Sequence, residues 1–261
     1  MRVPPRSPIA ATAVFLRALS AWHALLARML TQGKGAFRLF KAFGIQVWLH
    51  WTWFLVAAWQ LDSRKDQYSS LIWLLAEYVG MFAIVLTHEF GHSLACRQTG
   101  GRAHEIVLWP LGGIAYVSSP PRATAYLWSI AAGPLVNVAL IPIFALVNWS
   151  AVFAGLADIN PHLMHFMQRL ALINIVMLVF NILPIFPLDG GQLVRGLLWL
   201  KFGPVRSLMI AVVIGFIGGG LIALWALSQG SNWMMIMAGY LLFRCMDAWK
   251  AVRRVRAQSQ G

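Results

Sequence analysis

Two histidines and a glutamate stand close together in the sequence, in the run His88-Glu89-Phe90-Gly91-His92. In an α-helix, residues four positions apart share a face one turn apart, so both imidazoles can bind one metal ion. Glu89 can take a proton from a water molecule on that metal without being a ligand. Such chemistry needs zinc or a similar ion, because water is a poor nucleophile until its pKa is lowered towards about 7. The alternative is a packed, hydrogen-bonded His/Glu cluster without metal.

A third ligand is expected, because a catalytic zinc ion has three protein ligands and an open fourth position. Asp189 is the candidate, in the run NILPIFPLDGG at residues 181–191. The two prolines break a helix and the two glycines allow a tight turn. The pattern therefore predicts that Asp189 leaves a regular helix and approaches a neighbouring one. Its alternative role is to cap a helix at the membrane surface.

The composition indicates that these residues lie in a membrane protein. Of the 261 residues, 59% are hydrophobic and 11% are charged, whereas soluble domains have roughly 45–50% and 25%. This excludes an ordinary water-soluble enzyme and a disordered protein. The net charge of +13 reflects the scarcity of acidic residues, of which there are eight. Positive charges that flank apolar segments are what membrane topology requires, so no nucleic-acid partner is expected.

Six apolar segments are predicted to cross the bilayer, which takes about 20 residues per helix. They cover residues 45–61, 70–96, 124–147, 170–188, 205–227 and 232–246. If the N-terminus is inside, all 21 lysines and arginines except Arg64, Lys65 and Arg169 fall on the inner side. The positive-inside rule therefore predicts that both termini are cytoplasmic. The same topology places the 88–92 motif and Asp189 together, towards the cytoplasmic side.

Residues 105–118 form a different kind of segment. Two β-prone runs flank a turn signal at 110–113, which predicts a β-hairpin. At membrane depth, a hairpin is tolerated only where protein or a water-filled cavity shields its polar backbone. The predicted fold class is thus an all-α polytopic membrane protein with about six transmembrane helices and a small membrane-embedded β-hairpin.

The ends of the chain are basic. Residues 1–33 are predicted to form a basic amphipathic helix on the membrane surface. The alternatives are a targeting segment and a translation start near Met29. Residues 34–249 are predicted to form one intramembrane domain, and residues 250–261 a basic cytoplasmic tail.

The chain resembles the site-2 protease family of intramembrane zinc metalloproteases, in its compact prokaryotic type without appended regulatory domains. The resemblance covers residues 34–249 and is carried by HEFGH at 88–92, WPLGG at 109–113, GPLVN at 133–137 and the Asn-x-x-Pro-x-x-Pro-x-Asp-Gly pattern at 181–190. It implies a three-helix catalytic core formed by the second, third and fourth spans. It also implies one Zn²⁺ per chain bound by His88, His92 and Asp189, with Glu89 as the catalytic acid/base.

The resemblance implies that the chain is an intramembrane endopeptidase, which cuts transmembrane segments of membrane proteins within the lipid bilayer. Water activated by zinc attacks a peptide carbonyl, and Glu89 passes the proton to the leaving amine. A helical substrate must first be unwound, and the hairpin at 105–118 is expected to offer an edge for the extended segment. Asn137 and Asn181 are expected beside the substrate backbone. Interhelical hydrogen bonding is their alternative role.

Two other functions use the same residues. A metal transporter or sensor would hold its ion there, but transporters often contain internal repeats with broken helices, and no repeat is evident. A non-catalytic relative that only binds membrane helices would need neither Glu89 nor Asp189. The leading hypothesis is therefore the peptidase, in a bacterial cell membrane, with a plastid membrane as the minor alternative.

Overall fold

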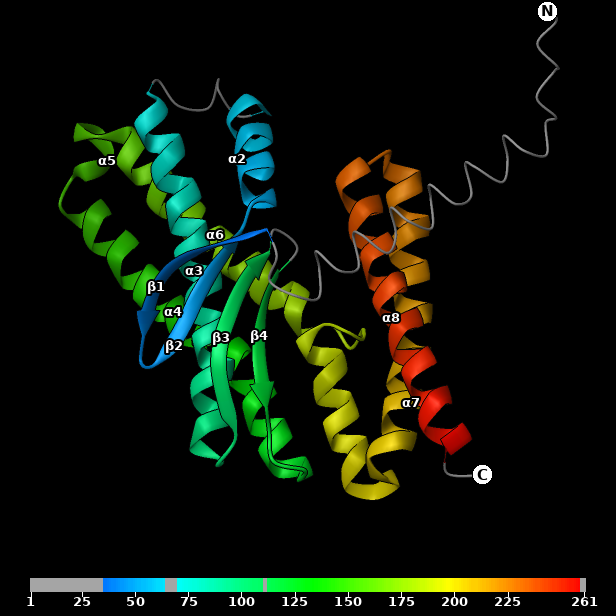
Figure 1. Cartoon of the computed structure of the whole chain (residues 1–261). Helices are drawn as coiled ribbons and strands as arrows, with labels where there is room; N and C mark the ends of the chain where they lie inside the picture. The colour runs from blue at the N-terminus through cyan, green and yellow to red at the C-terminus, as the bar shows by residue number, and fades with distance from the viewer. Residues whose placement is uncertain (1–34, 64–69, 110–111, 259–261) are drawn as a thin grey trace, which may run out of the picture.

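Long helices make up most of the structure, a computed structural model that describes residues 35–63, 70–109 and 112–258 (Figure 1). The helices are α2 (Thr52–Ser63), α3 (Leu71–Gln98), α4 (Ala123–Phe153), α5 (Leu156–Ile159), α6 (Pro161–Ile182), α7 (Asp189–Gln229) and α8 (Asn232–Gln258). Among the described residues, α3, α4, α6 and α7 are long and apolar enough to cross a membrane. The prediction of a mainly helical membrane protein is confirmed, although the number of spans stays a prediction.

Helices α3 and α4 pack against each other in opposite directions. His88 of α3 contacts Asn137 of α4, and His92 contacts Ser129. Residue numbers therefore increase along α3 in the direction in which they decrease along α4. Gly133 lies between these two contacts. A Cβ atom at Gly133 would lie 2.3 Å from the ring of His92, so only glycine allows α4 to approach the histidines this closely.

The segment that carries Asp189 differs from the prediction of a continuous span over 170–188. Helix α6 begins earlier, because the Asn160 side chain accepts a hydrogen bond from the backbone N–H of Leu163 and Pro161 occupies the first turn. It ends at Ile182, and six residues separate it from Asp189, which is the first residue of α7. Asp189 thus follows a loop at 183–188 and starts a new helix, rather than lying at the end of a crossing.

Helix α7 is itself broken at Gly203, where φ is 76° and ψ is 171°, followed by Pro204. Figure 1 shows the first part of α7 running on in the general direction of α6 before the chain reverses near this break. At about 1.5 Å per residue, Asp189 lies roughly 20 Å from the turn. The loop at 183–188 therefore lies between two helical segments, well before the chain reverses.

A four-stranded sheet takes up the beginning of the first predicted span. Its strands are β1 (Ala36–Ala42), β2 (Ile45–His50), β3 (Arg102–Trp109) and β4 (Gly112–Ser118), in the order β1-β2-β3-β4. The hairpin predicted at 105–118 is present as the antiparallel pair β3–β4. The helix predicted over 45–61 is wrong at its start, because β2 pairs in parallel with β3 there. Helix α2 covers only the remainder, with 12 residues.

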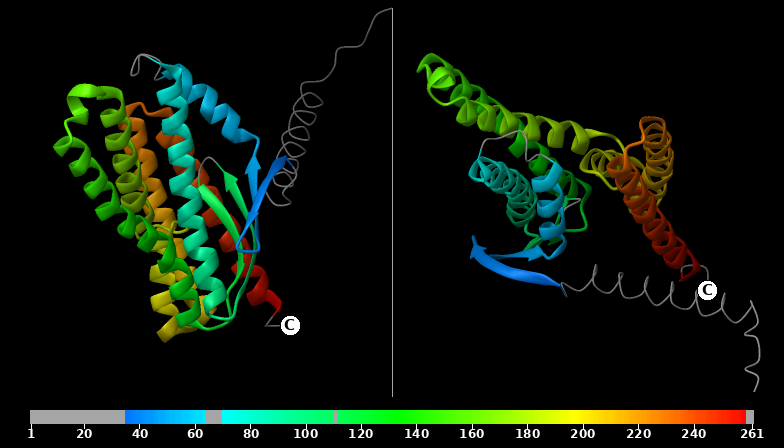
Figure 2. Two further views of the ribbon diagram at one scale, coloured as in Figure 1. Left: turned by 90° about the vertical axis from the view of Figure 1, so that its left-hand side faces the viewer. Right: turned by 90° about the horizontal axis from the view of Figure 1, so that it is seen from above.

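The sheet packs on one side of α3. Ile45, Val47 and Ile106 are fully buried and belong to a core that also contacts Tyr78 and Phe82 of α3. Figure 2 shows α7 and α8 grouped together apart from the sheet, with α4 and α6 covering α3 elsewhere. Helix α3 is therefore held by the sheet on one side and by α4 and α6 on others, which fixes the position of its histidine motif.

The predicted division of the chain into three segments is not tested. Residues 1–33 lie outside the described residues. The boundary placed between 249 and 250 falls inside α8, which continues to Gln258. The division into 1–33, 34–249 and 250–261 stays a prediction.

Candidate metal centre

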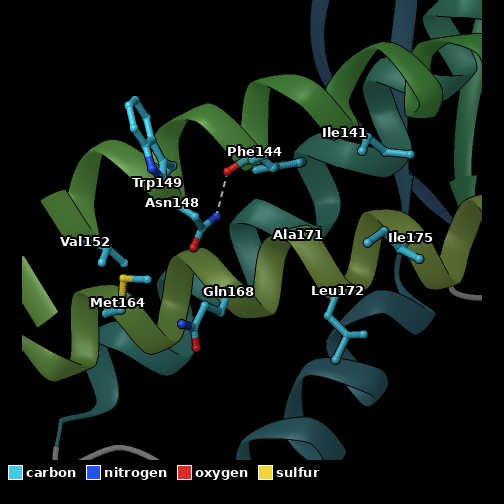
Figure 3. Close-up of a pocket in the computed structure, with 11 residues that line it drawn as sticks. Ile141, Phe144, Asn148, Trp149, Val152, Met164, Gln168, Ala171, Leu172 and Ile175 are labelled. Carbon is cyan, nitrogen blue, oxygen red and sulfur yellow. Dashed lines mark hydrogen bonds between the residues drawn. The ribbon is translucent and has the colours of Figure 1, made fainter.

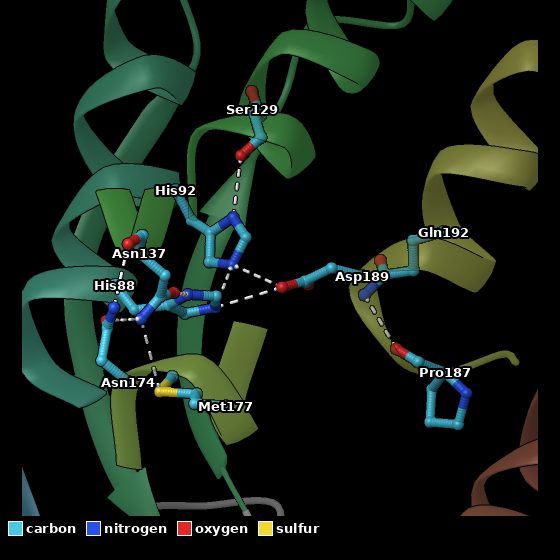
Figure 4. Close-up of polar contacts among 9 residues, drawn as sticks. All are labelled: His88, His92, Ser129, Asn137, Asn174, Met177, Pro187, Asp189 and Gln192. Carbon is cyan, nitrogen blue, oxygen red and sulfur yellow. Dashed lines mark hydrogen bonds and ion pairs between the residues drawn. The ribbon is translucent and has the colours of Figure 1, made fainter. Parts of the chain in front are cut away.

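Three side chains from two segments that are far apart in the sequence, α3 and the start of α7, converge among the helices. The Nε2 atoms of His88 and His92 lie 3.0 Å apart, and Asp189 Oδ2 lies 3.1 Å from the first and 3.4 Å from the second. Figure 4 shows the two rings of α3 facing the carboxylate at the start of α7. The three residues are 2%, 7% and 8% exposed. The sequence-predicted ligand set is thus gathered in one buried place.

The second nitrogen of each ring indicates which nitrogen carries the proton. His88 Nδ1 lies 2.6 Å from Asn137 Oδ1, and His92 Nδ1 lies 2.9 Å from the backbone oxygen of Ser129. Carbonyl oxygens only accept hydrogen bonds, so both rings donate from Nδ1. In a neutral imidazole the other nitrogen then has a free lone pair. Both Nε2 lone pairs are therefore directed towards Asp189.

This arrangement fits a bound cation. Two nitrogen lone pairs and a carboxylate oxygen repel one another when buried together, and a metal ion between them would satisfy all three. Zinc binds His nitrogen and carboxylate oxygen at about 2.0–2.2 Å, which in a tetrahedral site puts ligand atoms roughly 3.3 Å apart. The observed separations of 3.0–3.4 Å are close to this value. Three protein ligands also leave a fourth position open, as a catalytic site requires.

Glu89 lies beside the ligand group without belonging to it. It is 6% exposed, and the described residues whose ligand atoms lie within 4.8 Å of one another are only His88, His92 and Asp189. The Glu89 carboxyl interacts electrostatically with His92 and with Tyr240 of α8. It is thus a buried acid next to the candidate metal site, and its role as acid/base stays a prediction.

Asp189 is positioned by contacts to the loop that precedes it. The Gln192 side chain donates to the carbonyl of Pro187 at 3.0 Å and accepts from the Tyr126 hydroxyl of α4 at 3.0 Å. The thiol of Cys245, on α8, donates to the carbonyl of Phe186 at 3.1 Å. Gly190 is also required, because a Cβ atom there would lie 2.2 Å from the carbonyl oxygen of Ile182. Residues from α4, α7 and α8 therefore hold the candidate third ligand in place.

The two predicted substrate-binding asparagines lie in different surroundings. Asn137 is fully buried, and its carboxamide contacts His88 and Asn174 of α6. Asn181 is partly exposed near the end of α6, and its side chain makes no hydrogen bond to another described residue. Their role in substrate binding stays a prediction. Sequence reasoning missed Asn174, although an asparagine seven residues before Asn181 in an apolar span was a signal.

One further cavity, of about 480 Å³, lies between α4 and α6 and is lined mainly by apolar side chains (Figure 3). Its polar lining residues are Asn148 and Gln168, and it includes none of the three ligand residues. This cavity is therefore separate from the candidate metal centre.

The sequence and fold match known proteins. The profile described as peptidase family M50 matches residues 76–160 and 150–222. A protein named as a zinc metalloprotease from Methanocaldococcus jannaschii is 34% identical over 180 residues, which are 68% of this chain and 50% of that relative. A putative zinc metalloprotease from Mycobacterium tuberculosis is 28% identical over 239 residues, covering 80% of this chain and 57% of the relative. The chain thus spans little more than half the length of these relatives.

The fold is similar to that of a solved structure, a site-2 protease from Methanocaldococcus jannaschii. The TM-score is 0.61 at 26% identity, and the match covers 82% of this chain and 94% of the other. The family profile spans both segments that supply the converging side chains, the helix with His88 and His92 and the start of α7. The resemblance to site-2 proteases drawn from the motifs is confirmed, and the chain belongs to peptidase family M50.

Proposed function

We propose that this chain is an intramembrane zinc endopeptidase that hydrolyses peptide bonds in transmembrane segments of other membrane proteins. The observation that carries the proposal is the convergence of His88 Nε2, His92 Nε2 and Asp189 Oδ2 within 4.8 Å, buried among helices apolar enough to cross a membrane. In this proposal the three residues hold one zinc ion. Bound zinc supplies Lewis acidity, which polarises a carbonyl and brings the pKa of water towards about 7.

Glu89 is the proposed acid/base. Its carboxylate takes a proton from the attacking water and returns it to the nitrogen of the leaving amine, so that the proton is conserved. Burial supports this role, because few waters compete for the carboxylate at 6% exposure. A glutamate within an apolar span is costly unless it is paired or functional.

The sheet offers a place for an unwound substrate. Strand β4 lies at the edge of the sheet, with β3 on one side only, and in Figure 1 its free side is the one nearer α7. In this proposal an extended substrate segment adds to β4 through main-chain hydrogen bonds. Asn181, partly exposed and close in sequence to Asp189, is proposed to contact the same segment.

The site lies within the bilayer and towards one end of α3. At about 1.5 Å per residue, His92 is roughly 9 Å from Gln98, the last residue of α3. The charge distribution of the sequence supports a cell-membrane protein with both termini, and this end of α3, on the cytoplasmic side.

Two measurements test the proposal. Zinc content per purified chain should be near one in the wild type and should fall clearly in Asp189→Ala. Glu89→Gln should retain zinc but lose cleavage of a model transmembrane substrate in detergent or vesicles. Glu77→Gln is the matched control, because Glu77 is a buried glutamate of the same helix, about 18 Å from Glu89 along the helix axis, and it should retain both.

Two results would overturn the proposal. Full zinc content in Asp189→Ala would exclude Asp189 as a ligand. Cleavage by Glu89→Gln at the wild-type rate would exclude Glu89 as the acid/base. A transporter that uses the same ligands would instead lose metal flux across vesicles in Asp189→Ala and cleave no substrate.

A further inference from the structure

His88 is oriented by a chain of two asparagines, which Figure 4 shows beside the metal centre. Asn137 Oδ1 accepts from His88 Nδ1 at 2.6 Å, and Asn137 Nδ2 donates to Asn174 Oδ1 at 2.8 Å. Asn174 Nδ2 in turn donates to the backbone carbonyl of Asn137 at 3.0 Å. Both asparagines are 0% exposed, so water does not replace any of these bonds.

The orientation of the Asn137 carboxamide decides which form of His88 is present. A carboxamide has an acceptor oxygen at one end and donor N–H groups at the other. If Asn137 turned over, its nitrogen would donate to His88 Nδ1, and the neutral ring would carry its proton on Nε2. That nitrogen is the one directed towards Asp189, and once protonated it has no lone pair for a metal ion.

Asn174 prevents this reversal. Its own orientation is set by the Asn137 backbone carbonyl, which can only accept, so Asn174 must present its nitrogen there and its oxygen to the Asn137 side chain. That oxygen in turn requires the nitrogen end of Asn137, which leaves the oxygen end for His88. The other acceptor near Asn137 Nδ2 is Met177 Sδ at 3.8 Å, and a thioether sulfur is only a weak acceptor.

The two histidines thus depend on backbone carbonyls of the same helix in different ways. His92 donates directly to the carbonyl of Ser129 in α4. His88 is linked to the carbonyl of Asn137 in α4 only through two side chains, one of them from α6. A backbone carbonyl cannot reverse its polarity, whereas a carboxamide can. The His88 side therefore needs an additional residue to fix its polarity.

We propose that Asn174 is a positioning residue for the metal centre: it fixes the Asn137 carboxamide and thereby keeps the Nε2 lone pair of His88 available to the metal. The inference rests on the zinc site of the proposed function. Asn174 itself makes no hydrogen bond to His88, His92 or Asp189, so its effect is transmitted by Asn137.

The test is the zinc affinity of purified protein, measured by competition with a chromophoric chelator. Asn174→Leu should weaken zinc binding by roughly 10- to 100-fold, the usual effect of losing an outer partner of a ligand histidine. The matched control is Asn148→Leu, the same change at a carboxamide of α4 that donates to the Phe144 carbonyl and lines the separate cavity. It should bind zinc like the wild type.

A second change separates this role from general packing. Asn137→Asp replaces the carboxamide by a carboxylate, which has oxygen at both ends and can only accept from His88. The double variant Asn137→Asp with Asn174→Leu should therefore regain most of the zinc affinity that Asn174→Leu loses. A residue that acts only by filling space would not be rescued in this way, because the leucine is still present.

The outcomes are distinct from those of the proposed function. If the wild type binds no zinc, the proposed function fails. If the wild type binds zinc and Asn174→Leu binds it equally well, the inference is wrong. It is also wrong if adding Asn137→Asp does not restore the zinc affinity that Asn174→Leu loses. Thermal unfolding in detergent shows whether Asn174→Leu folds. If it does not, the comparison with the wild type and the rescue by Asn137→Asp are repeated with Asn174→Ala.

Discussion

The two halves of the candidate metal centre are built in different ways. On one side, His88 and His92 come from a single turn of α3, and α4 contacts both rings. On the other side, Asp189 follows a loop at 183–188 that is held by side chains of α7 and α8. A helix fixes the two candidate ligands of α3 through its own backbone hydrogen bonds, whereas the loop depends on tertiary contacts that can be removed one by one.

This difference predicts graded effects. A change that forces α3 and α4 apart displaces two ligands together, so it should be severe. A change at one loop contact leaves the others in place, so it should be moderate or small. The predictions below use zinc affinity and thermal unfolding in detergent as common measurements.

Gly133→Val should have the largest effect, because a Cβ atom at this position would lie 2.3 Å from the His92 ring and 2.9 Å from His88 Cε1. Overpacking of this kind costs roughly 1–3 kcal/mol in the free energy of unfolding, and the displaced rings should lose most of the bound zinc. Gly220→Val is the control, since a Cβ atom there would meet no atom within 4 Å. Wild-type zinc content in Gly133→Val would show that α4 does not constrain the histidines.

Gln192→Leu should have an intermediate effect. It removes the hydrogen bonds to the Pro187 carbonyl and the Tyr126 hydroxyl, each worth about 0.5–1.5 kcal/mol. If part of this free energy restrains Asp189, zinc affinity should fall by up to about tenfold. The control Gln98→Leu loses the bond from Trp128 at the last residue of α3, which makes no hydrogen bond to the loop at 183–188 in the described part of the chain, and should bind zinc normally. A larger loss of zinc affinity in Gln98→Leu than in Gln192→Leu would show that Gln192 does not restrain Asp189.

Cys245→Val should have the smallest effect. It removes one thiol hydrogen bond to the Phe186 carbonyl, and a thiol is a weak donor. We expect zinc affinity to fall by less than about threefold, which corresponds to the lower end of the hydrogen-bond range. Cys245→Ser keeps a donor and should match the wild type. Complete loss of zinc in Cys245→Val would mean that α8, rather than α7, controls the position of Asp189.

The sequence was most informative where structure is local. The positions of His88 and His92 on one face follow from the periodicity of the helix, and the predicted span at 70–96 differs from α3 by only one or two residues at each end. The hairpin of β3 and β4 was also predicted, because a turn signal between two β-prone runs acts over a few residues.

Prediction was weaker where elements far apart in the sequence meet. Residues 45–50 are apolar enough to look like the start of a span, yet they form β2, because pairing with β3 satisfies their backbone. Hydrophobicity alone does not distinguish a buried strand from part of a membrane helix. The position of Asp189 at the start of α7 was likewise missed, because the proline pattern shows that a helix ends without showing where the next one begins.

The sequence by itself determined the membrane class, the paired histidines with Glu89 beside them, and Asp189 as the candidate third ligand. These follow from composition and from spacings within a few residues. Only the tertiary structure brought Asp189 within 3.1–3.4 Å of the two histidines and joined His88 to Asn174 through Asn137. Such contacts depend on how α3, α4, α6 and α7 pack, and packing is decided by the shapes of surfaces that lie far apart along the chain.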